Sequence, residues 1–406
     1  MLIIQWLVHC ALIFATTTFS HYIQSQLHPE IELPIGLEES ESSKDSLFSL
    51  HQNLINIESI SGNEQTVGEF LEAYLKSHNY TVERQYVDPL PTSLHDFRAE
   101  EPKQKQRFNL LAYPGEKRQT PVLLSSHLDT VPPHYGHEIH EHDQIWGRGS
   151  VDAKGAVSCM IQTSQELLAS RQISPNDVSL LFVVGEETGG DGMRRANDLQ
   201  LKWKTVIFGE PTELKLASGH KGILIFTVKA HGKAGHSGYP WLGQSANHLL
   251  VPALVALQKL EFPSSQKYGN STLNIGRISG GVAAKLEDVI AEEARAEIGI
   301  RIAAGSPGTV KRLVSDAVKA VDENLELDFS EGSYPPVYID SDVDGFETTT
   351  VNYGTDIPNL NGKHKRYLYG PGSILVAHSD HEQLKASQLL IAVEGYKRLV
   401  NFALKS

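Results

Sequence analysis

The sequence predicts an α/β protein in which a mostly parallel β-sheet, with helices on both faces, is interrupted by a smaller inserted α+β domain. Short apolar runs alternate with helical patterns in the first half of the chain, as is typical of such a sheet. The character changes near Ala217, where apolar and polar residues begin to alternate one by one. The 406 residues fit about two domains, and 40% hydrophobic with 21% charged content is normal for a soluble globular protein.

The first domain is expected to begin with helical structure and to continue as strands and helices in turn. Residues 46–77 carry apolar side chains at helical spacing, and another helix is expected over 156–168. Four apolar runs have the length of buried strands: 109–112, 122–124, 178–184 and 205–208. Because these runs alternate with helices, they predict parallel strands that are covered on both faces.

The inserted domain is expected to span residues 217–333. The stretches KGILIFTVKAHG, STLNIGRISGG and RAEIGIRI alternate apolar and polar residues, as half-exposed strands do. Helices are expected over 245–260 and 310–324. This order of strands and helices predicts a small domain with one open sheet face.

The first domain, residues 46–216, is expected to resume over residues 334–406. This last segment contains the apolar run SILVAH, which is expected to be a strand, and a helical pattern over 381–405. One α/β domain interrupted by one insertion is the most economical arrangement of these segments.

The N-terminal residues 1–20 have the pattern of a secretory signal peptide. The apolar stretch from Leu2 to Ala15 has the length of a signal-peptide core and is too short to span a bilayer comfortably. Since no Lys or Arg precedes it, an uncleaved anchor or a buried N-terminal helix stays an alternative. Residues 21–45 are polar and acidic and are expected to be a propeptide or a disordered arm. We therefore expect a secreted, extracellular protein.

Composition narrows the partners and the surface chemistry. A net charge of −13 without a long basic run argues against nucleic acid, and no later stretch is apolar enough for a transmembrane helix. Cys10 would leave with the signal peptide, so Cys159 would be the single mature thiol, expected in the core. The sequons at Asn79 and Asn270 are expected to carry N-linked glycans.

Candidate metal ligands follow the apolar runs or lie in the glycine-rich loop GRGSVDAKG. Because the carboxyl ends of parallel strands meet at one edge of a sheet, we expect these side chains to lie close together. Taken singly, each has a simpler explanation, and Asp152 alone suits a helix N-cap. Together, these oxygen and nitrogen ligands without cysteine suit Zn²⁺, Mn²⁺ or Co²⁺ in an open catalytic site. The five candidates are His127, Asp152, Glu187, Glu210 and His378.

Charge balance favours two metal ions. The carboxylates of Asp152, Glu187 and Glu210, together with one bridging hydroxide, would neutralise two divalent cations. Glu186 stands beside Glu187 without being needed as a ligand, so we expect it to act as the general base. Asp129 is expected to accept the second ring N–H of a ligating histidine.

The motifs around these residues resemble a metallopeptidase family that contains acetylornithine deacetylase, succinyl-diaminopimelate desuccinylase, aminoacylase and glutamate carboxypeptidase. The matching segments are SSHLDTVPP, GRGSVDAKGA, GEETGGDGM, GEPTE, GKAGHSGYP and GPGSILVAHSDHE. They stand in the family's order between residues 125 and 382, and the similarity covers nearly all of the chain after residue 45. The resemblance implies a catalytic domain and an inserted lid and dimerisation domain that closes on substrate.

The resemblance also implies how the ligands are shared between two zinc ions, with Co²⁺ or Mn²⁺ as alternatives. One ion would be bound by His127 and Glu210, the other by Glu187 and His378. Asp152 would bridge the two ions.

Further roles follow from the same resemblance. Glu186 would be the base, and Asp129 the supporting acid. His236 matches a lid histidine that stabilises the oxyanion, often across a dimer interface. Arg301 matches a lid arginine whose guanidinium binds a substrate carboxylate. Gly372 lies in a glycine loop near the substrate.

Some residues depart from the family pattern or compete with it. Asp288 stands about where family members often have an asparagine, and a carboxylate there would repel an anionic substrate. His381 competes with His378 for the last ligand position, but the family's His-x-x-x-Glu spacing is met by His378 and Glu382. Four other histidines in a polar loop are expected to face solvent: His134, His137, His140 and His142.

These observations predict a secreted dinuclear zinc metallocarboxypeptidase that hydrolyses the C-terminal peptide bond. A deacetylase or aminoacylase that acts on N-acyl amino acids is the alternative within the family. A non-catalytic binding protein on the same fold is the alternative from another class, and it would contain no stoichiometric zinc. The resemblance allows a homodimer formed through the lid domain, although some members are monomers.

Overall fold

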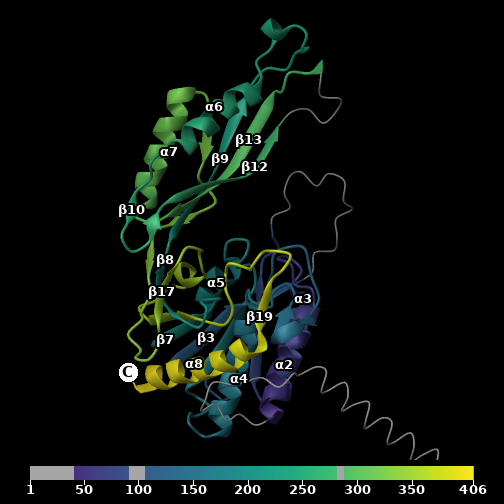
Figure 1. Ribbon diagram of the computed structural model, residues 1–406, viewed down its shortest axis with the longest axis vertical. Helices are drawn as coiled ribbons and strands as arrows, with labels where there is room; N and C mark the ends of the chain where they lie inside the picture. The colour runs from purple at the N-terminus through teal and green to yellow at the C-terminus, as the bar shows by residue number, and fades with distance from the viewer. Residues whose placement is uncertain (1–40, 91–105, 281–287, 406) are drawn as a thin grey trace, which may run out of the picture. The chain divides into compact units, whose positions relative to one another are not determined.

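The computed structural model describes residues 41–90, 106–280 and 288–405 (Figure 1). The predicted signal peptide lies outside these residues. The predicted arm over 21–45 overlaps helix α2 (Glu41–Asn56), which begins earlier than the helix expected from residue 46. In the described part of the chain, no helix combines the length and the apolar character that crossing a membrane requires.

The chain divides into two compact units. The first contains the chain up to Leu216 together with Asp342–Glu347 and Asn359–Ser406. The second contains Ala217–Ser341 and Thr348–Pro358. The second unit therefore extends past residue 333, where the insertion was expected to end.

The first unit is built on a six-stranded sheet with the order β1-β2-β6-β3-β7-β18. The pairs β3–β6, β3–β7 and β7–β18 are parallel, whereas β1 and β2 are antiparallel strands at one edge. Every residue of β2, β3, β6 and β7 is buried, as expected for strands with both faces covered. The predicted mostly parallel sheet is confirmed. The strands are β1 (Thr81–Val87), β2 (Arg107–Tyr113), β3 (Val122–His127), β6 (Val178–Val183), β7 (Thr205–Gly209) and β18 (Lys365–Tyr369).

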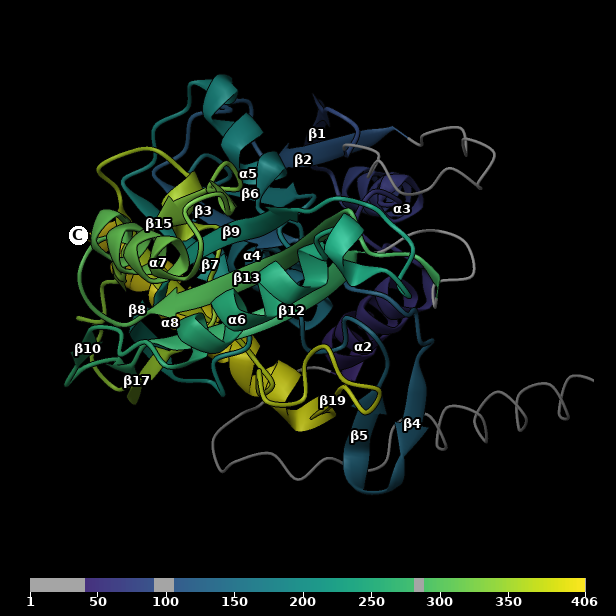
Figure 2. The ribbon, with the colours of Figure 1, turned by 90° about the horizontal axis from the view of Figure 1, so that it is seen from above.

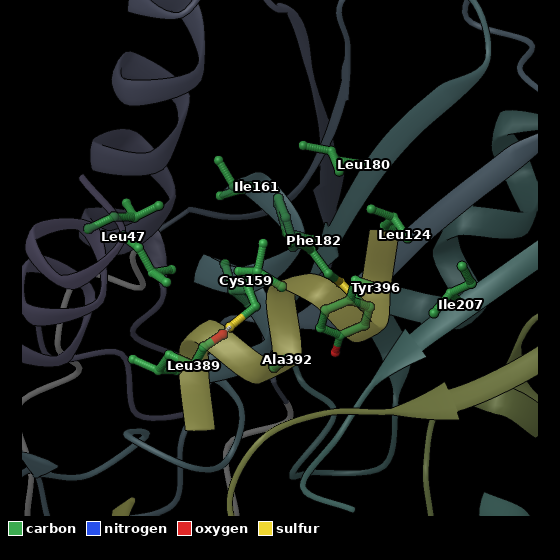
Figure 3. Packing of buried hydrophobic residues seen from close by; sticks show 14 of the residues in the cluster. Leu47, Leu124, Cys159, Ile161, Leu180, Phe182, Ile207, Leu389, Ala392 and Tyr396 are labelled. Carbon is green, nitrogen blue, oxygen red and sulfur yellow. Dashed lines mark hydrogen bonds between the residues drawn. The ribbon is translucent and has the colours of Figure 1, made fainter. Parts of the chain in front are cut away.

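Helices pack against this sheet and share one apolar core with it. Helices α4 (Lys154–Ala169) and α8 (Ala386–Lys405) contact each other and β3, while α3 (Gln65–Ser77) and α5 (Asp191–Ala196) contact β1 and β2. Figure 3 shows Cys159 of α4 among apolar side chains from the sheet and from α8. The Cys159 thiol is fully buried, as expected, and donates to the Leu389 carbonyl oxygen at 3.3 Å.

Two predictions about the C-terminal segment are wrong. The helix expected over 381–405 begins only at Ala386, because Gln383–Lys385 forms strand β19, which pairs with β5 (Gln144–Trp146). The run SILVAH forms turns rather than a strand, and its Leu375 is 83% exposed. The strand that joins the sheet here is β18, whose sequence KRYLY was not expected to be one.

The second unit has a sheet with the order β12-β13-β9-β14, and β15 also pairs with β9. Helices α6 (Ala246–Gln258) and α7 (Pro307–Val321) pack side by side on this sheet, as Figure 2 shows from above. Burial alternates along β13, so one face of the sheet carries the apolar core. The strands are β9 (Gly222–His231), β12 (Thr272–Gly280), β13 (Glu293–Ile302), β14 (Glu326–Asp328) and β15 (Ser333–Tyr334).

Short strands complete the two units. They are β4 (Glu138–His140), β8 (Leu216–His220), β10 (Ser264–Ser265), β11 (Gly269–Asn270), β16 (Val337–Tyr338) and β17 (Thr348–Val351). In the second unit, β8 lies between β16 and β17 in a three-stranded sheet.

Candidate metal centre

The parallel strands of the first unit bring three ligand-bearing segments to one edge of its sheet. His127, the last residue of β3, is opposite Val183, the last residue of β6. Glu187 follows β6 after a short turn, and Glu210 directly follows β7, the other neighbour of β3. Carboxyl ends of neighbouring parallel strands lie together, so this edge is where a site is expected.

A first group of metal-capable side chains contains His127, Asp152 and Glu210, all buried. His127 Nε2 lies 3.1 Å from Asp152 Oδ1 and 3.8 Å from Glu210 Oε1. The other ring nitrogen, Nδ1, donates to the Asp129 carbonyl oxygen at 2.9 Å and lies 3.6 Å from the Asp129 carboxylate. The histidine is thus oriented by a backbone carbonyl rather than by the carboxylate that we expected to do this.

A second group shares Asp152 with the first and adds Glu187 and His378. His378 Nε2 lies 3.0 Å from Glu187 Oε2 and 3.3 Å from Asp152 Oδ2. Asp152 therefore presents one carboxylate oxygen to each histidine. His378 has a left-handed backbone conformation with φ +62°, so it reaches the site from a turn and not from a strand end.

Asp152 is held in place by Glu382, a residue noted in the sequence only for its spacing from His378. One Glu382 oxygen accepts backbone N–H groups from Gly149, Val151 and Asp152 at 3.0, 3.1 and 3.1 Å. The other oxygen accepts from the buried Arg148 guanidinium at 2.6 Å. Asp152 itself does not cap helix α4, whose N-cap residue is Ala153. Its carboxylate is therefore available to both histidines.

Asp129 holds the adjacent glutamates by their backbone. Its two carboxylate oxygens accept the backbone N–H of Glu186 at 3.1 Å and of Glu187 at 3.2 Å. Ser61 Oγ donates to the same carboxylate at 2.7 Å. Burial disfavours the charged form of Asp129, but its contacts with His127 and Ser61 outweigh burial and lower its pKa. The half-buried Glu186 belongs to neither ligand group among the described residues.

The electrostatics of the cluster favour positive charge at both histidines. Burial disfavours the charged form of Asp152, but hydrogen bonds from His127 and His378 hold its pKa well below its usual range. Hydrogen bonds to Asp152 and Glu187 raise the pKa of His378 to about 10. Burial and the charge of Asp152 raise the pKa of Glu187 to about 6. Three carboxylates around two imidazoles thus form an anionic cage.

The residues fit two divalent cations. Each group offers two carboxylate oxygens and one imidazole nitrogen, the donor types of catalytic zinc sites. Within each group, the ligand atoms lie within 4.8 Å of one another. The single carboxylate common to both groups suits a bridge between neighbouring ions.

The lid residues lie in the second unit. His236 pairs with Val289 in an isolated bridge, and the Asp288 carbonyl oxygen accepts from the Ser237 backbone at 2.9 Å. The Gly238 backbone N–H donates to His236 Nδ1 at 3.0 Å, so the proton of the neutral ring is on Nε2. The exposed His236 therefore presents an N–H donor to solvent.

Other predicted residues have these surroundings. Gly372, in the first unit, has φ +77°, and a Cβ there would lie 2.8 Å from Val151 Cγ1, so only glycine fits. His381 is exposed, and its ring hydrogen-bonds Asp380 at 2.8 Å. The sequon residues Asn79 and Asn270 are both exposed. Of the loop histidines, His140 is exposed, whereas His134 and His137 are half-buried; the side chain of His142 lies outside the described residues.

Comparison with known proteins identifies the family. A model of the peptidase dimerisation domain matches residues 218–327, and a model of peptidase family M28 matches residues 109–206. A probable carboxypeptidase of Aspergillus terreus is 45% identical over 391 residues, covering 89% of this chain and 87% of its own. A peptidase M20 domain-containing protein of Sordaria macrospora is 45% identical over 395 residues, covering 90% of this chain and 87% of its own.

Solved structures show the same fold at low sequence identity. The di-peptidase Dug1p from Saccharomyces cerevisiae has a TM-score of 0.72 at 16% identity, covering 90% of this chain and 97% of its own. The M20 family metallo-carboxypeptidase Sso-CP2 from Sulfolobus solfataricus has a TM-score of 0.64 at 16% identity, covering 89% of this chain and 100% of its own. On the strength of the relatives in sequence, the chain belongs to the M20 family of metallopeptidases.

Proposed function

We propose that the protein is a secreted dinuclear zinc carboxypeptidase that removes C-terminal residues from peptides. The observation that carries this proposal is the carboxylate of Asp152, which faces both His127 and His378 at the edge of the sheet. Two ions held by the two ligand groups would polarise the scissile carbonyl and ease the deprotonation of water. Relatives that are named probable carboxypeptidase match this chain over 87% of their own length, which supports this choice of substrate bond.

The proton is moved by Glu186. Its backbone is fixed next to the ligand Glu187 because Asp129 accepts both N–H groups. A carboxylate that binds no metal can take a proton from water and give it to the leaving amine. Asp129 thereby positions the base and one ligand with a single side chain.

The lid supplies two groups. The Nε2–H of His236 would donate to the substrate oxygen that becomes negative in the transition state. Arg301 would bind the substrate's terminal carboxylate, for which a planar guanidinium is suited. We further propose a homodimer formed through the second unit, supported by the match of residues 218–327 to a dimerisation domain.

Secretion rests on the N-terminal apolar stretch from Leu2 to Ala15 and on the two exposed sequon residues, Asn79 and Asn270. An extracellular enzyme meets peptides rather than biosynthetic N-acyl amino acids, which favours the carboxypeptidase over the deacylase.

The test is hydrolysis of a panel of dipeptides, N-blocked peptides and N-acetylated amino acids by the purified zinc-loaded protein. We expect cleavage of N-blocked peptides with a free C-terminus and much slower cleavage of acetylated amino acids. Glu186→Gln should keep its zinc and lose turnover by about 10²–10⁴-fold, because only the general base is removed. The matched variant Glu187→Gln should lose about one zinc ion per chain as well as turnover, because Glu187 belongs to one of the two ligand groups. Faster deacetylation than peptide cleavage, or near-normal turnover in Glu186→Gln, would contradict the proposal.

A further inference from the structure

Among the described residues of the second unit, the guanidinium of Arg301 has no anionic partner. Arg301 lies on β13, opposite Ile223 of β9, and is half-buried. Among the described residues, no carboxylate, carbonyl or hydroxyl oxygen forms an ion pair or hydrogen bond with it. A half-buried arginine is usually paired, because its charge and its five donors are costly to leave unsatisfied.

Gly354 brings a second polar group to the same place. A Cβ built on Gly354 would lie 2.2 Å from the Tyr334 hydroxyl oxygen and 3.1 Å from Arg301 Nη1. Both polar atoms therefore lie against one backbone position, and a side chain there would displace the phenol. Gly354 and Tyr334 are half-buried, so this position can be reached from solvent.

His220 supports the phenol without adding charge. Its ring lies edge-to-face with Tyr334, with 5.8 Å between ring centroids, and is fully buried. The Nδ1–H donates to the Lys221 carbonyl oxygen at 2.7 Å, and Nε2 lies 3.1 Å from the Thr355 hydroxyl. Burial and the nearby charge of Arg301 lower the pKa of His220 to about 4, so the ring is neutral at physiological pH. Both ring nitrogens are thus satisfied within the second unit.

A carboxylate is chemically suited to bind an arginine and a phenol hydroxyl at the same time. It has two oxygens, of which one can accept from the guanidinium and the other from the phenol O–H. Hydrogen bonds to a charged group are stronger than neutral ones, so the phenol adds both affinity and orientation.

We propose that Tyr334 is a specificity-determining residue that donates a hydrogen bond to the same substrate carboxylate that Arg301 binds. Gly354 leaves the room for both groups, and His220 positions the phenol ring. This inference rests on the proposed function, because it takes the free C-terminal carboxylate of a peptide as the ligand of Arg301.

The test removes the hydroxyl alone. In Tyr334→Phe the ring remains and can still pack on His220, whereas the hydrogen bond to substrate is lost. We expect KM for N-blocked peptides with a free C-terminus to rise about 10-fold or more, with kcat changed much less. Tyr338→Phe is the matched control, because Tyr338 is 66% exposed on β16, and its KM should be unchanged.

A binding measurement makes the test independent of turnover. The free amino acid released from the best substrate serves as a competitive inhibitor, with the amide of the same amino acid for comparison. Tyr334→Phe should weaken inhibition by the free amino acid about 10-fold and leave inhibition by the amide unaltered. Gly354→Ala should weaken inhibition by the free amino acid as well, because the added methyl displaces the hydroxyl.

Arg301→Met separates the inference from the proposed function. If Arg301→Met loses affinity for the free amino acid and Tyr334→Phe does not, the role of Tyr334 is wrong and the proposed function stands. If neither variant changes this affinity, the carboxylate site itself is wrong, and with it the role of Arg301 in the proposed function.

Discussion

The Glu382 carboxylate accepts the backbone N–H of Asp152 at 3.1 Å, across 230 positions of sequence. It therefore fixes the loop that carries the one ligand common to both groups. The same carboxylate also accepts from the buried Arg148 of this loop at 2.6 Å, so Glu382 binds the loop through both its backbone and a side chain.

Glu382→Ala is expected to weaken both metal binding and folding. Groups that orient metal ligands typically contribute 10–100-fold to metal affinity. The substitution also leaves the Arg148 guanidinium buried without its counter-charge, which costs about 3–5 kcal/mol of unfolding free energy. Zinc titration with a competing chelator and urea denaturation measure the two effects. In the control Arg148→Met/Glu382→Gln, no charge is left buried without a partner, so part of the lost unfolding free energy should return. A Glu382→Ala protein with normal zinc affinity would contradict the role of Glu382 in holding the Asp152 loop.

The metal-free protein is expected to show a pH-dependent contribution to stability from His378. Its folded pKa of about 10 lies above the ordinary value of 6.5, because Asp152 and Glu187 accept hydrogen bonds from the ring. A raised pKa contributes stability that is fully present below pH 6.5 and is lost as the pH rises toward 10.

Urea denaturation of the chelated protein between pH 6 and 10, with His378→Asn as control, measures this contribution. The unfolding free energy of His378→Asn is subtracted from that of the wild type because Lys154 also contributes to the pH dependence. Burial lowers the pKa of Lys154 to about 7, so its contribution to stability changes with pH in the opposite direction. The difference should decrease steadily above pH 6.5. A constant difference over the whole range would be inconsistent with the charged cluster.

The edge of the second unit's sheet is expected to form the dimer contact. β12 is an edge strand, and its Ile278 is 61% exposed; Val251 of α6 is 55% exposed. Ile278→Lys should yield a monomer by light scattering at micromolar concentration, because a charge would be buried in an apolar contact. Val321→Lys, on α7 and 39% exposed, is the matched control and should stay dimeric. A wild-type monomer would refute the homodimer.

Both sequons are expected to be occupied when the protein passes through a eukaryotic secretory pathway. Asn79 and Asn270 are exposed, so an attached glycan meets no packed neighbour. Intact mass before and after enzymatic deglycosylation should differ by two glycans in the wild type and by one in Asn79→Gln or Asn270→Gln. An unchanged mass in secreted protein would count against this expectation, and protein retained inside the cell would count against secretion.

The strand-end ligands could be predicted from sequence because a simple rule governs them. His127, Glu187 and Glu210 follow apolar runs that are parallel neighbours in the sheet, so their convergence follows from the topology. The sequence pattern did not predict β18, because its Lys and Arg residues interrupt the apolar run that is typical of a buried strand. This strand is stabilised by its pairing with β7.

The supporting contacts could not be predicted, since they depend on three-dimensional register. Nothing local in the sequence indicates that Glu382 accepts three backbone N–H groups from the loop of Asp152. The start of α8 could not be predicted either, because residues just before it form β19, which pairs with β5. His378 was expected at the end of a strand, but it lies in a turn, and the sequence does not indicate its left-handed backbone conformation.

Metal content per chain, measured by atomic emission on purified protein and on two variants, shows whether two ions are bound and whether both depend on Asp152. The two ligand groups share Asp152, so we expect two zinc ions in the wild type, about one in Glu187→Gln and fewer than one in Asp152→Ala. A wild-type protein that binds only one ion, or an Asp152→Ala protein that keeps two, would contradict a dinuclear site built around Asp152.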